Sequence, residues 1–359
     1  NIRFRLDGVL HDVGKVPTEL YKLLLSRIKL LSEVKLNIYD KPQDGRFTIR
    51  IQEKDVETRT SVLPGPYGES VAMRILLPKT IEMGMEDLGM QKNVLSTIEK
   101  ELKKPNGMII TTGPTGSGKT TTLYAFLKRI SLHEIKVITI EDPIEYHISG
   151  ITQTQINPQK GYDFANGLKS ILRQDPDVIL VGEIRDSETA STAMHAALTG
   201  HLVFSTLHTN DAAGTIPRLV DLGVKSNTIA PAINIAIAQR LIRKLCNKCK
   251  RWINPSVEEE KTIKENLKNV KKIPTKFKLF VAGKCTDCNF MGYKGRIGIF
   301  EAFLVDSEIE KLISKNPSET DIKEAAAKQG MLTVYQDGLL KVLEGVTSFE
   351  ELNRVVSED

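Results

Sequence analysis

The stretch MIITTGPTGSGKTTTLYAFL, residues 108–127, constrains the fold of this chain more than any other part of the sequence. Apolar and β-branched residues lead into a glycine-rich loop, and a helical pattern follows at once. In this setting the loop wraps around phosphates and its backbone N–H groups donate hydrogen bonds to them, a lysine reaches the β- and γ-phosphates, and a threonine binds Mg²⁺. We therefore predict a nucleotide-binding loop formed by Gly113, Pro114, Thr115, Gly116, Ser117, Gly118, Lys119, Thr120 and Thr121.

The pattern on either side of this loop predicts an α/β protein of two domains. From residue 105 to 359 strands and helices alternate, which indicates a parallel sheet with crossover helices. The pattern over residues 1–82 predicts a small α+β domain. It has a strand at 2–6, a helix near 18–32 and then extended runs in which apolar and polar residues alternate. Pro78 and the stretch 84–89 are interpreted as the linker, and 92–103 as the helix that follows it.

Composition excludes several classes of function. The 50 basic and 45 acidic residues give a net charge of only +5, and aromatic residues make up 6%, so nothing indicates a nucleic-acid partner. The longest apolar run, TIAPAINIAIAQRL from Thr228, is interrupted by Pro231 and Asn234 and is shorter than the roughly 18 residues that span a bilayer. The chain opens with NIRFRLDG, without a methionine or a signal sequence, so we expect a fragment of a longer protein.

Acidic residues follow two strand-like runs downstream of the loop. VITIEDPIEY places Glu141, Asp142 and Glu145 at the end of a β-rich run, and DPDVILVGEIRD places Glu183 after a buried strand. The carboxyl ends of parallel strands meet beside a phosphate loop, where an acid can orient water or hold Mg²⁺. For a lone acid a helix cap or a solvated charge is the usual alternative. Two such strands after a phosphate loop favour the functional interpretation.

Two histidines flank a third apolar run, GHLVFSTLHTND. His201 precedes the run and His208 follows it. An imidazole close to a γ-phosphate could report whether that phosphate is present. A satisfied structural histidine is the alternative for each, and position favours the sensor role more for His208 than for His201.

Four segments together resemble a known family. GPTGSGKT, ITIEDPIEY, DPDVILVGEIRD and TGHLVFSTLHTND are similar to the Walker A, Asp box, Walker B and His box of the secretion ATPase superfamily, in the branch of type II secretion and type IV pilus motors. The resemblance covers nearly the whole chain. It implies a PAS-like domain (1–82) joined to a RecA-like ATPase domain (105–359), with ATP and Mg²⁺ as cofactors. It also implies a homohexamer at the cytoplasmic face of the inner membrane.

The resemblance assigns roles to particular residues. It implies that Glu145 positions the attacking water and that Glu183 belongs to the Mg²⁺ shell together with Thr120. Arg59 and Arg74 match arginines that reach the nucleotide from the small domain, a task that suits a guanidinium fork. An exposed charge on a strand face is the alternative for either arginine, and Arg3 and Arg5 are further candidates.

The four cysteines form two CxxC pairs about 35 residues apart, within a segment that covers residues 246–288. Paired CxxC turns supply the four thiolates that structural Zn²⁺ requires, so we predict a zinc site at Cys246, Cys249, Cys285 and Cys288. The metal would staple the base of a lysine-rich loop or helical hairpin over 252–284. A disulfide is disfavoured in a cytosolic protein, and a redox CxxC lacks the expected βαβ setting.

Together with the family resemblance, these observations predict an ATP-hydrolysing hexameric motor that extends a pilus or pseudopilus by acting on a membrane platform protein, with an adaptor as a further partner. The chain would be cytoplasmic and peripheral to the inner membrane. The tetracysteine element is similar to that of assembly and secretion motors, whereas retraction motors generally lack it. The alternatives are a DNA-uptake or nucleic-acid-translocating motor, a pilus retraction motor, and a nucleotide-dependent scaffold without turnover.

Overall fold

The computed structural model describes residues 1–51, 53–76, 83–131, 134–270, 273–274 and 276–356 of the 359-residue chain. The chain divides into two compact units, residues 1–82 and 83–359, and each is described here by itself. Pro78, which we assigned to the linker, lies outside the described residues.

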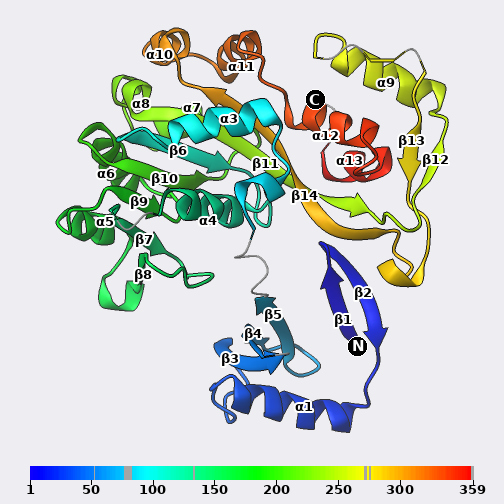
Figure 1. The fold of residues 1–359 in the computed structure, drawn as a ribbon. Coiled ribbons are helices and arrows are strands. Elements are labelled where there is room, and N and C mark those ends of the chain that lie inside the picture. Colours follow the sequence, from blue (N-terminus) through cyan, green and yellow to red (C-terminus); the bar gives the residue numbers. More distant parts are fainter. Residues whose placement is uncertain (52, 77–82, 132–133, 271–272, 275, 357–359) are drawn as a thin grey trace. The chain divides into compact units, whose positions relative to one another are not determined.

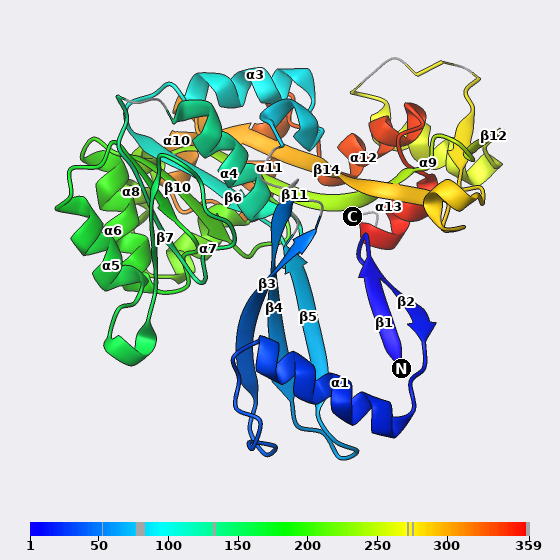
Figure 2. The ribbon, with the colours of Figure 1, turned by 60° about the horizontal axis from the view of Figure 1, so that its bottom comes forward.

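The first unit combines a hairpin, a helix and a three-stranded antiparallel sheet (Figure 2). The hairpin consists of β1 (Ile2–Leu6) and β2 (Val9–Gly14), and helix α1 (Thr18–Leu31) follows it. The sheet has the order β3 (Gln43–Ile51), β4 (Lys54–Leu63) and β5 (Ser70–Leu76). The strand predicted at 2–6 and the helix predicted near 18–32 are therefore confirmed.

Polar contacts hold α1 to the rest of this unit. Lys29 of α1 is buried and forms an ion pair of 2.8 Å with Glu69, whose backbone carbonyl accepts a hydrogen bond of 2.6 Å from Tyr21. The Ser32 hydroxyl, just past the helix, donates to Thr60 of β4 at 2.9 Å. Alternate side chains of β4 are buried, as expected for a sheet that covers a core on one face.

The second unit is built on a seven-stranded sheet (Figure 1). The spatial order is β14 (Tyr293–Leu304), β11 (Ile233–Leu245), β6 (Gly107–Thr112), β10 (Leu202–Leu207), β9 (Val178–Val181), β7 (Val137–Glu141) and β8 (Thr152–Gln155). Strand β11 pairs with β14 in antiparallel fashion, and all the other neighbours are parallel. Strands β6, β7, β9 and β10 are buried along their whole length, in keeping with their mostly apolar and β-branched sequences.

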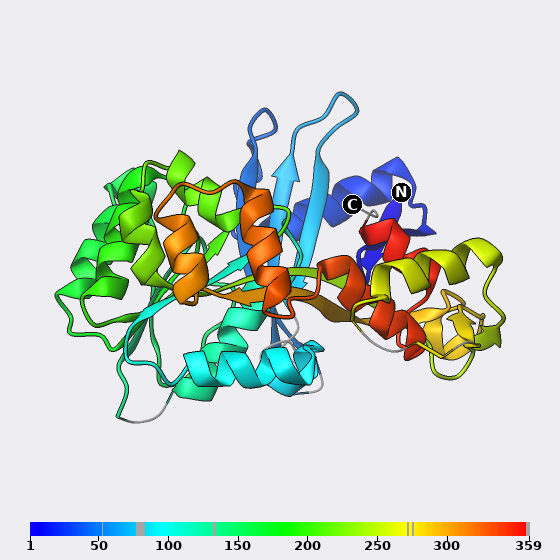
Figure 3. The same cartoon turned by 90° about the horizontal axis from the view of Figure 1, so that it is seen from above.

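Helices cover both faces of this sheet, with a hydrophobic core under each layer (Figure 3). One face carries α3 (Lys92–Glu101) and α4 (Lys119–Ile130). The other face carries α5 (Phe164–Leu172), α6 (Ser187–Leu198), α7 (Thr215–Asp221), α8 (Ser226–Ala232), α10 (Ser307–Ile313), α11 (Glu319–Lys328), α12 (Val334–Leu343) and α13 (Phe349–Val355). No helix among the described residues is both long and apolar enough to cross a membrane.

The stretch 84–89, which we interpreted as a linker, differs from that prediction. It forms a short 3-10 helix, Met85–Leu88, in which Met85 is 2% exposed and Leu88 is 5% exposed. Both side chains belong to the core beneath α3 and α4. Its flanking glycines gave the segment the appearance of a connection, but its apolar side chains make it part of the second unit.

The segment between the two cysteine pairs contains a helix between two short strands. Strands β12 (Arg251–Ile253) and β13 (Leu279–Val281) are antiparallel, and α9 (Val257–Leu267) lies between them in the sequence. Ser256 caps α9 by accepting a hydrogen bond from the Glu259 backbone N–H. Ile263 and Leu267 of α9 are fully buried, so the insert packs on the main core instead of extending as a free hairpin.

Candidate nucleotide-binding site and metal centre

The predicted phosphate loop lies between β6 and α4, at the carboxyl edge of the sheet. Three of its glycines have positive φ: 141° at Gly113, 80° at Gly116 and 93° at Gly118. A Cβ added at Gly113 would lie 2.6 Å from the Gln239 carbonyl oxygen, so the close approach of β11 also requires glycine here. The N-terminus of α4 opens at Lys119, where its unpaired N–H groups suit an anion.

Lys119 lies folded over this loop and is largely buried. Its Nζ donates to the Gly113 carbonyl at 2.7 Å and to the Pro114 carbonyl at 3.3 Å. Burial lowers the pKa of Lys119 to about 8, the Glu183 carboxylate works in the opposite direction, and the Arg240 guanidinium lowers the pKa further. A phosphate would replace both carbonyls as the partner of this cation and strengthen its charged form.

Glu183 and His208 lie beside Lys119, as the sequence predicted for a shared strand edge. Glu183 is mostly buried. One oxygen of its carboxylate pairs with Arg185 at 2.5 Å, and the other lies 3.6 Å from His208 Nε2. The His208 side chain is half exposed, and its pKa is lowered by partial burial and by the charge of Lys119. A neutral imidazole in this position can donate or accept one hydrogen bond at the phosphate side of the site.

The acids at the end of β7 differ in their surroundings. Glu141 is buried and accepts hydrogen bonds from Tyr124, from Thr139 at 2.6 Å and from Gln153 at 3.1 Å. Three of its roughly four acceptor positions are thus used inside the core, which makes it a stabilising residue rather than the best-placed group for orienting water. Glu145 lies in the half-buried loop after β7 and keeps its predicted role as a proposal.

His201 does not lie with the other predicted site residues. It precedes β10, its backbone carbonyl accepts from Gly107 at the start of β6, and its Nδ1 lies 3.1 Å from the Ala196 carbonyl. The phosphate loop follows the other end of β6, about 17 Å away at roughly 3.3 Å per residue. The parallel register thus places His201 at the opposite edge of the sheet, and we correct its assignment from sensor to structural histidine.

Arg59 and Arg74 face each other across β4 and β5 of the first unit. The register pairs Arg46 with Arg59 and Arg59 with Arg74, so three guanidinium groups share one face of the sheet. Arg59 lies 3.5 Å from Glu57. Like charges directly opposite each other destabilise a sheet, and Glu57 supplies one counter-charge to this row.

No motif in the sequence marks three residues that contact the nucleotide-binding loop or the segment after β10. Gln239 and Arg240 contact the loop from β11, and they occur in an apolar run that contains no nucleotide-binding motif. Glu301 of β14 is 3% exposed and accepts from the backbone N–H of Ala212 at 2.9 Å. Burial raises the pKa of Glu301 to about 7. Their positions depend on strand order, which no local motif encodes.

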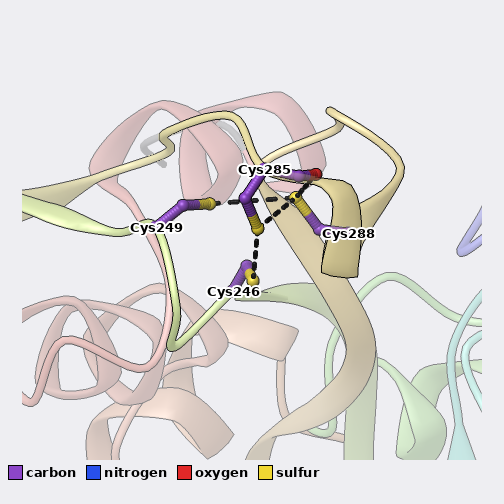
Figure 4. A group of neighbouring side chains, drawn as sticks. All are labelled: Cys246, Cys249, Cys285 and Cys288. Carbon is purple, nitrogen blue, oxygen red and sulfur yellow. Dashed lines mark hydrogen bonds between the residues drawn. The ribbon is translucent and has the colours of Figure 1, made fainter.

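The four cysteines converge at one point, from the end of β11 and from the turn before β14 (Figure 4). The Sγ atoms lie within 4.8 Å of one another, with separations of 3.7 Å for Cys246–Cys285, 3.8 Å for Cys249–Cys288 and 3.6 Å for Cys285–Cys288. A tetrahedron with Zn–S bonds of about 2.3 Å has sulfur separations of about 3.8 Å. The sulfur atoms therefore fit a tetrahedral zinc ion.

The pKa values of two thiols at this centre shift in opposite directions. Although burial works against the change, hydrogen bonds at the backbone of Cys285 and Gly292 lower the pKa of Cys288 to about 6. Burial and the neighbouring thiols instead raise the pKa of Cys249 to about 12. The Gly292 N–H donates to the Cys288 Sγ at 3.2 Å. Lys248 and Lys294 lie outside the centre and both pair with Asp287, at 3.0 and 2.9 Å. With zinc bound, this set would supply a structural cross-link and no hydrolytic chemistry.

The sequence is similar to known proteins along nearly its whole length. The family model described as "Type II/IV secretion system protein" matches residues 1–354. Type II secretion system protein E of Dickeya dadantii is 44% identical over 360 residues, which cover 100% of this chain and 70% of the relative. Type IV pilus assembly ATPase PilB of Pseudomonas aeruginosa is 43% identical over 358 residues, which cover 99% of this chain and 62% of the relative.

Solved structures agree with the fold. The pilus retraction motor PilT with bound ADP has a TM-score of 0.65 at 26% identity, over 99% of this chain and 90% of PilT. The ATPase DotB of Yersinia pseudotuberculosis has a TM-score of 0.68 at 18% identity, over 98% of this chain and 86% of DotB, which bears on the fold alone. The predicted α/β class with a RecA-like ATPase domain is confirmed.

Proposed function

The chain belongs to the type II/IV secretion system protein family, and on this premise we propose that it is an ATP-hydrolysing motor subunit that drives pilus or pseudopilus assembly. One observation carries the proposal: Lys119, Glu183 and His208 come together beside a glycine-rich loop at the carboxyl edge of the sheet. This is the arrangement that phosphoryl transfer needs, because catalysis there rests on positioning and charge.

The loop from Gly113 to Thr121 would hold the phosphates of ATP. Its backbone N–H groups and the N-terminus of α4 would bind phosphate oxygens, and Lys119 would exchange its two carbonyl partners for the β- and γ-phosphates. The Thr120 hydroxyl and Glu183 would hold Mg²⁺, the carboxylate directly or through water. When bound, Mg²⁺ neutralises charge on the phosphate oxygens.

Three further roles complete the proposed site. Glu145 would orient the attacking water, since Glu141 is buried and already accepts three hydrogen bonds inside the core. His208 would detect the γ-phosphate next to Glu183. Arg59 and Arg74 of the first unit would bring cations to the phosphates of a nucleotide, from the same subunit or a neighbour.

The assembly would be a homohexamer that is cytoplasmic and peripheral to the inner membrane, acting on a platform protein there, with a cytoplasmic adaptor as a further partner. Zinc at the four cysteines would fix the insert that carries α9. The same centre favours an extension motor over a retraction motor.

The test uses the purified chain, Mg²⁺ and ATP. Glu145→Gln should bind ATP nearly as well as the wild type and lose hydrolysis, because the amide cannot polarise water. Glu188→Gln, an exposed acid on α6 that pairs with Lys169, is the matched control and should retain hydrolysis. Normal turnover by Glu145→Gln would move the water-orienting role to Glu183. DNA should leave the rate unchanged, and stimulation by DNA would favour a nucleic-acid motor instead.

A further inference from the structure

Strand β11 runs past the end of β6 and continues alongside the phosphate loop. The parallel register pairs Ala238 with Thr112, the last residue of β6, so on this side the next two residues of β11 lie beside the loop, while β14 pairs with them on the other side. These residues are Gln239 and Arg240. None of the nucleotide-binding motifs recognised in the sequence includes them.

Gln239 contacts the phosphate loop with both its backbone and its side chain. The side chain is buried, and its Nε2 donates to the Ser117 carbonyl at 2.7 Å. A Cβ at Gly118 would lie 3.0 Å from the same nitrogen. The carboxamide thus fills the space under the turn that ends at α4, and it fixes the direction of the Ser117 peptide.

Arg240 spans from the phosphate loop to the loop after β10. Its Nη2 donates to the Asn210 carbonyl at 2.6 Å, and its Nη1 donates to the Gln239 carbonyl at 3.1 Å. The same Nη1 would lie 3.1 Å from a Cβ at Gly113. Asn210 is two residues beyond His208, so the guanidinium binds the segment that presents this histidine.

The segment that follows His208 also contacts side chains from strands β6 and β14. The Thr209 backbone N–H donates to the Thr112 hydroxyl at 2.8 Å, and the Ala212 N–H donates to Glu301 at 2.9 Å. The Arg240 guanidinium contacts both the phosphate loop and the segment that follows His208. Its position is therefore coupled to both sides of the phosphate-binding space.

We propose that Gln239 and Arg240 are positioning residues: Gln239 holds the phosphate loop in its binding conformation, and Arg240 holds His208 at the γ-phosphate side of the site. The inference rests on the proposed ATPase function and deepens it. It separates two effects, since Gln239 acts on every phosphate-bearing nucleotide, whereas Arg240 acts chiefly through His208 on the γ-phosphate.

Equilibrium binding of ADP and of a non-hydrolysable ATP analogue tests this division. Arg240→Gln should weaken analogue binding by about tenfold and leave ADP binding within about twofold, because a charged hydrogen bond to the His208 segment is lost. Gln239→Glu should weaken both nucleotides by a similar factor, since its carboxylate repels the Ser117 carbonyl and the phosphates. Lys244→Gln, which removes an exposed cation from the same strand, is the matched control.

A double-mutant cycle with His208→Ala decides whether Arg240 acts through the histidine. In the His208→Ala background, Arg240→Gln should add less than about a twofold further loss of discrimination between the two nucleotides. An equal loss in both backgrounds, or unchanged discrimination in Arg240→Gln, would overturn the proposal. Arg240→Lys keeps one donor for Asn210 and should recover part of the discrimination, which global unfolding would not explain.

Failure of this inference is distinguishable from failure of the proposed function. If wild-type protein binds neither nucleotide and hydrolyses no ATP, the ATPase assignment itself is wrong. If wild-type protein distinguishes the analogue from ADP, Arg240→Gln does so equally well and Gln239→Glu binds both nucleotides with wild-type affinity, the ATPase assignment stands and both positioning roles are refuted.

Discussion

Removal of one zinc ligand should destabilise the second unit by an amount that follows from the chain connectivity. Cys288→Ser replaces a buried thiolate whose sulfur lies 3.6 and 3.8 Å from two other cysteine sulfurs. A hydroxyl is a much poorer zinc ligand, so we expect the site to lose its metal. The protein should then lose a cross-link between two segments of the chain.

The size of the effect can be worked from the loop that this cross-link closes. Cys246 and Cys285 are 39 residues apart, as are Cys249 and Cys288. Treated like a covalent cross-link, closure of such a loop stabilises the folded chain by about 4 kcal/mol. For a unit of this size about 2 °C of Tm accompanies each kcal/mol, so the expected fall is roughly 8 °C.

Elemental analysis and a thermal melt together make the assay. Wild-type protein should contain about one zinc per chain, and Cys288→Ser should lose both the zinc and the stability. Asn247→Ser alters an exposed residue between the first two cysteines and is the matched control. Wild-type protein that is free of zinc, with a melt that a chelator leaves unchanged, would refute the structural-zinc reasoning and remove the main reason for preferring an extension motor.

Three other perturbations have distinct outcomes. Lys119→Ala and Arg59→Ala subunits, inactive alone, should regain ATPase activity when mixed if the arginine acts across an interface, and inactivity at every ratio would favour action within one chain. Burial raises the pKa of Glu301 from 4.5 to about 7, so the folded form retains a proton that the unfolded chain loses. As the pH rises from about 4.5 to about 7, the unfolding free energy of the wild type should therefore fall by up to about 3 kcal/mol more than that of Glu301→Gln. Unfolding free energies that change with pH in parallel in the two proteins would contradict this. Gly113→Ala should abolish nucleotide binding, because its Cβ would meet a backbone oxygen at 2.6 Å, and normal affinity would refute that reason.

Features that depend on local sequence could be predicted, and features that depend on strand order could not. The phosphate loop was predictable because its glycines, lysine and flanking strand and helix are contiguous. The cysteine cluster was predictable because each CxxC turn presents two thiolates and only their pairing is long-range. The position of Glu183 beside His208 followed from the rule that parallel strands end at one edge.

The misassigned and overlooked residues depend on the arrangement of the strands. His201 and His208 flank the same strand, and the rule that parallel strands end at one edge places His208 beside the phosphate loop and His201 at the opposite edge, so the role first assigned to His201 was avoidable. Gln239 and Arg240 act because β11 lies next to β6, a neighbour relation that the sequence does not reveal. Met85 was read as linker because its burial depends on packing against a distant core.

The central claim is that this chain hydrolyses ATP at the loop that carries Lys119. The most direct test compares wild-type protein with Lys119→Ala for ATP binding and for phosphate release in the presence of Mg²⁺. The account predicts that wild-type protein releases phosphate, and that Lys119→Ala binds ATP weakly and releases none, because the cation at the β- and γ-phosphates is gone. Phosphate release by Lys119→Ala at the wild-type rate, or a correctly folded wild-type protein that binds no ATP, would contradict it.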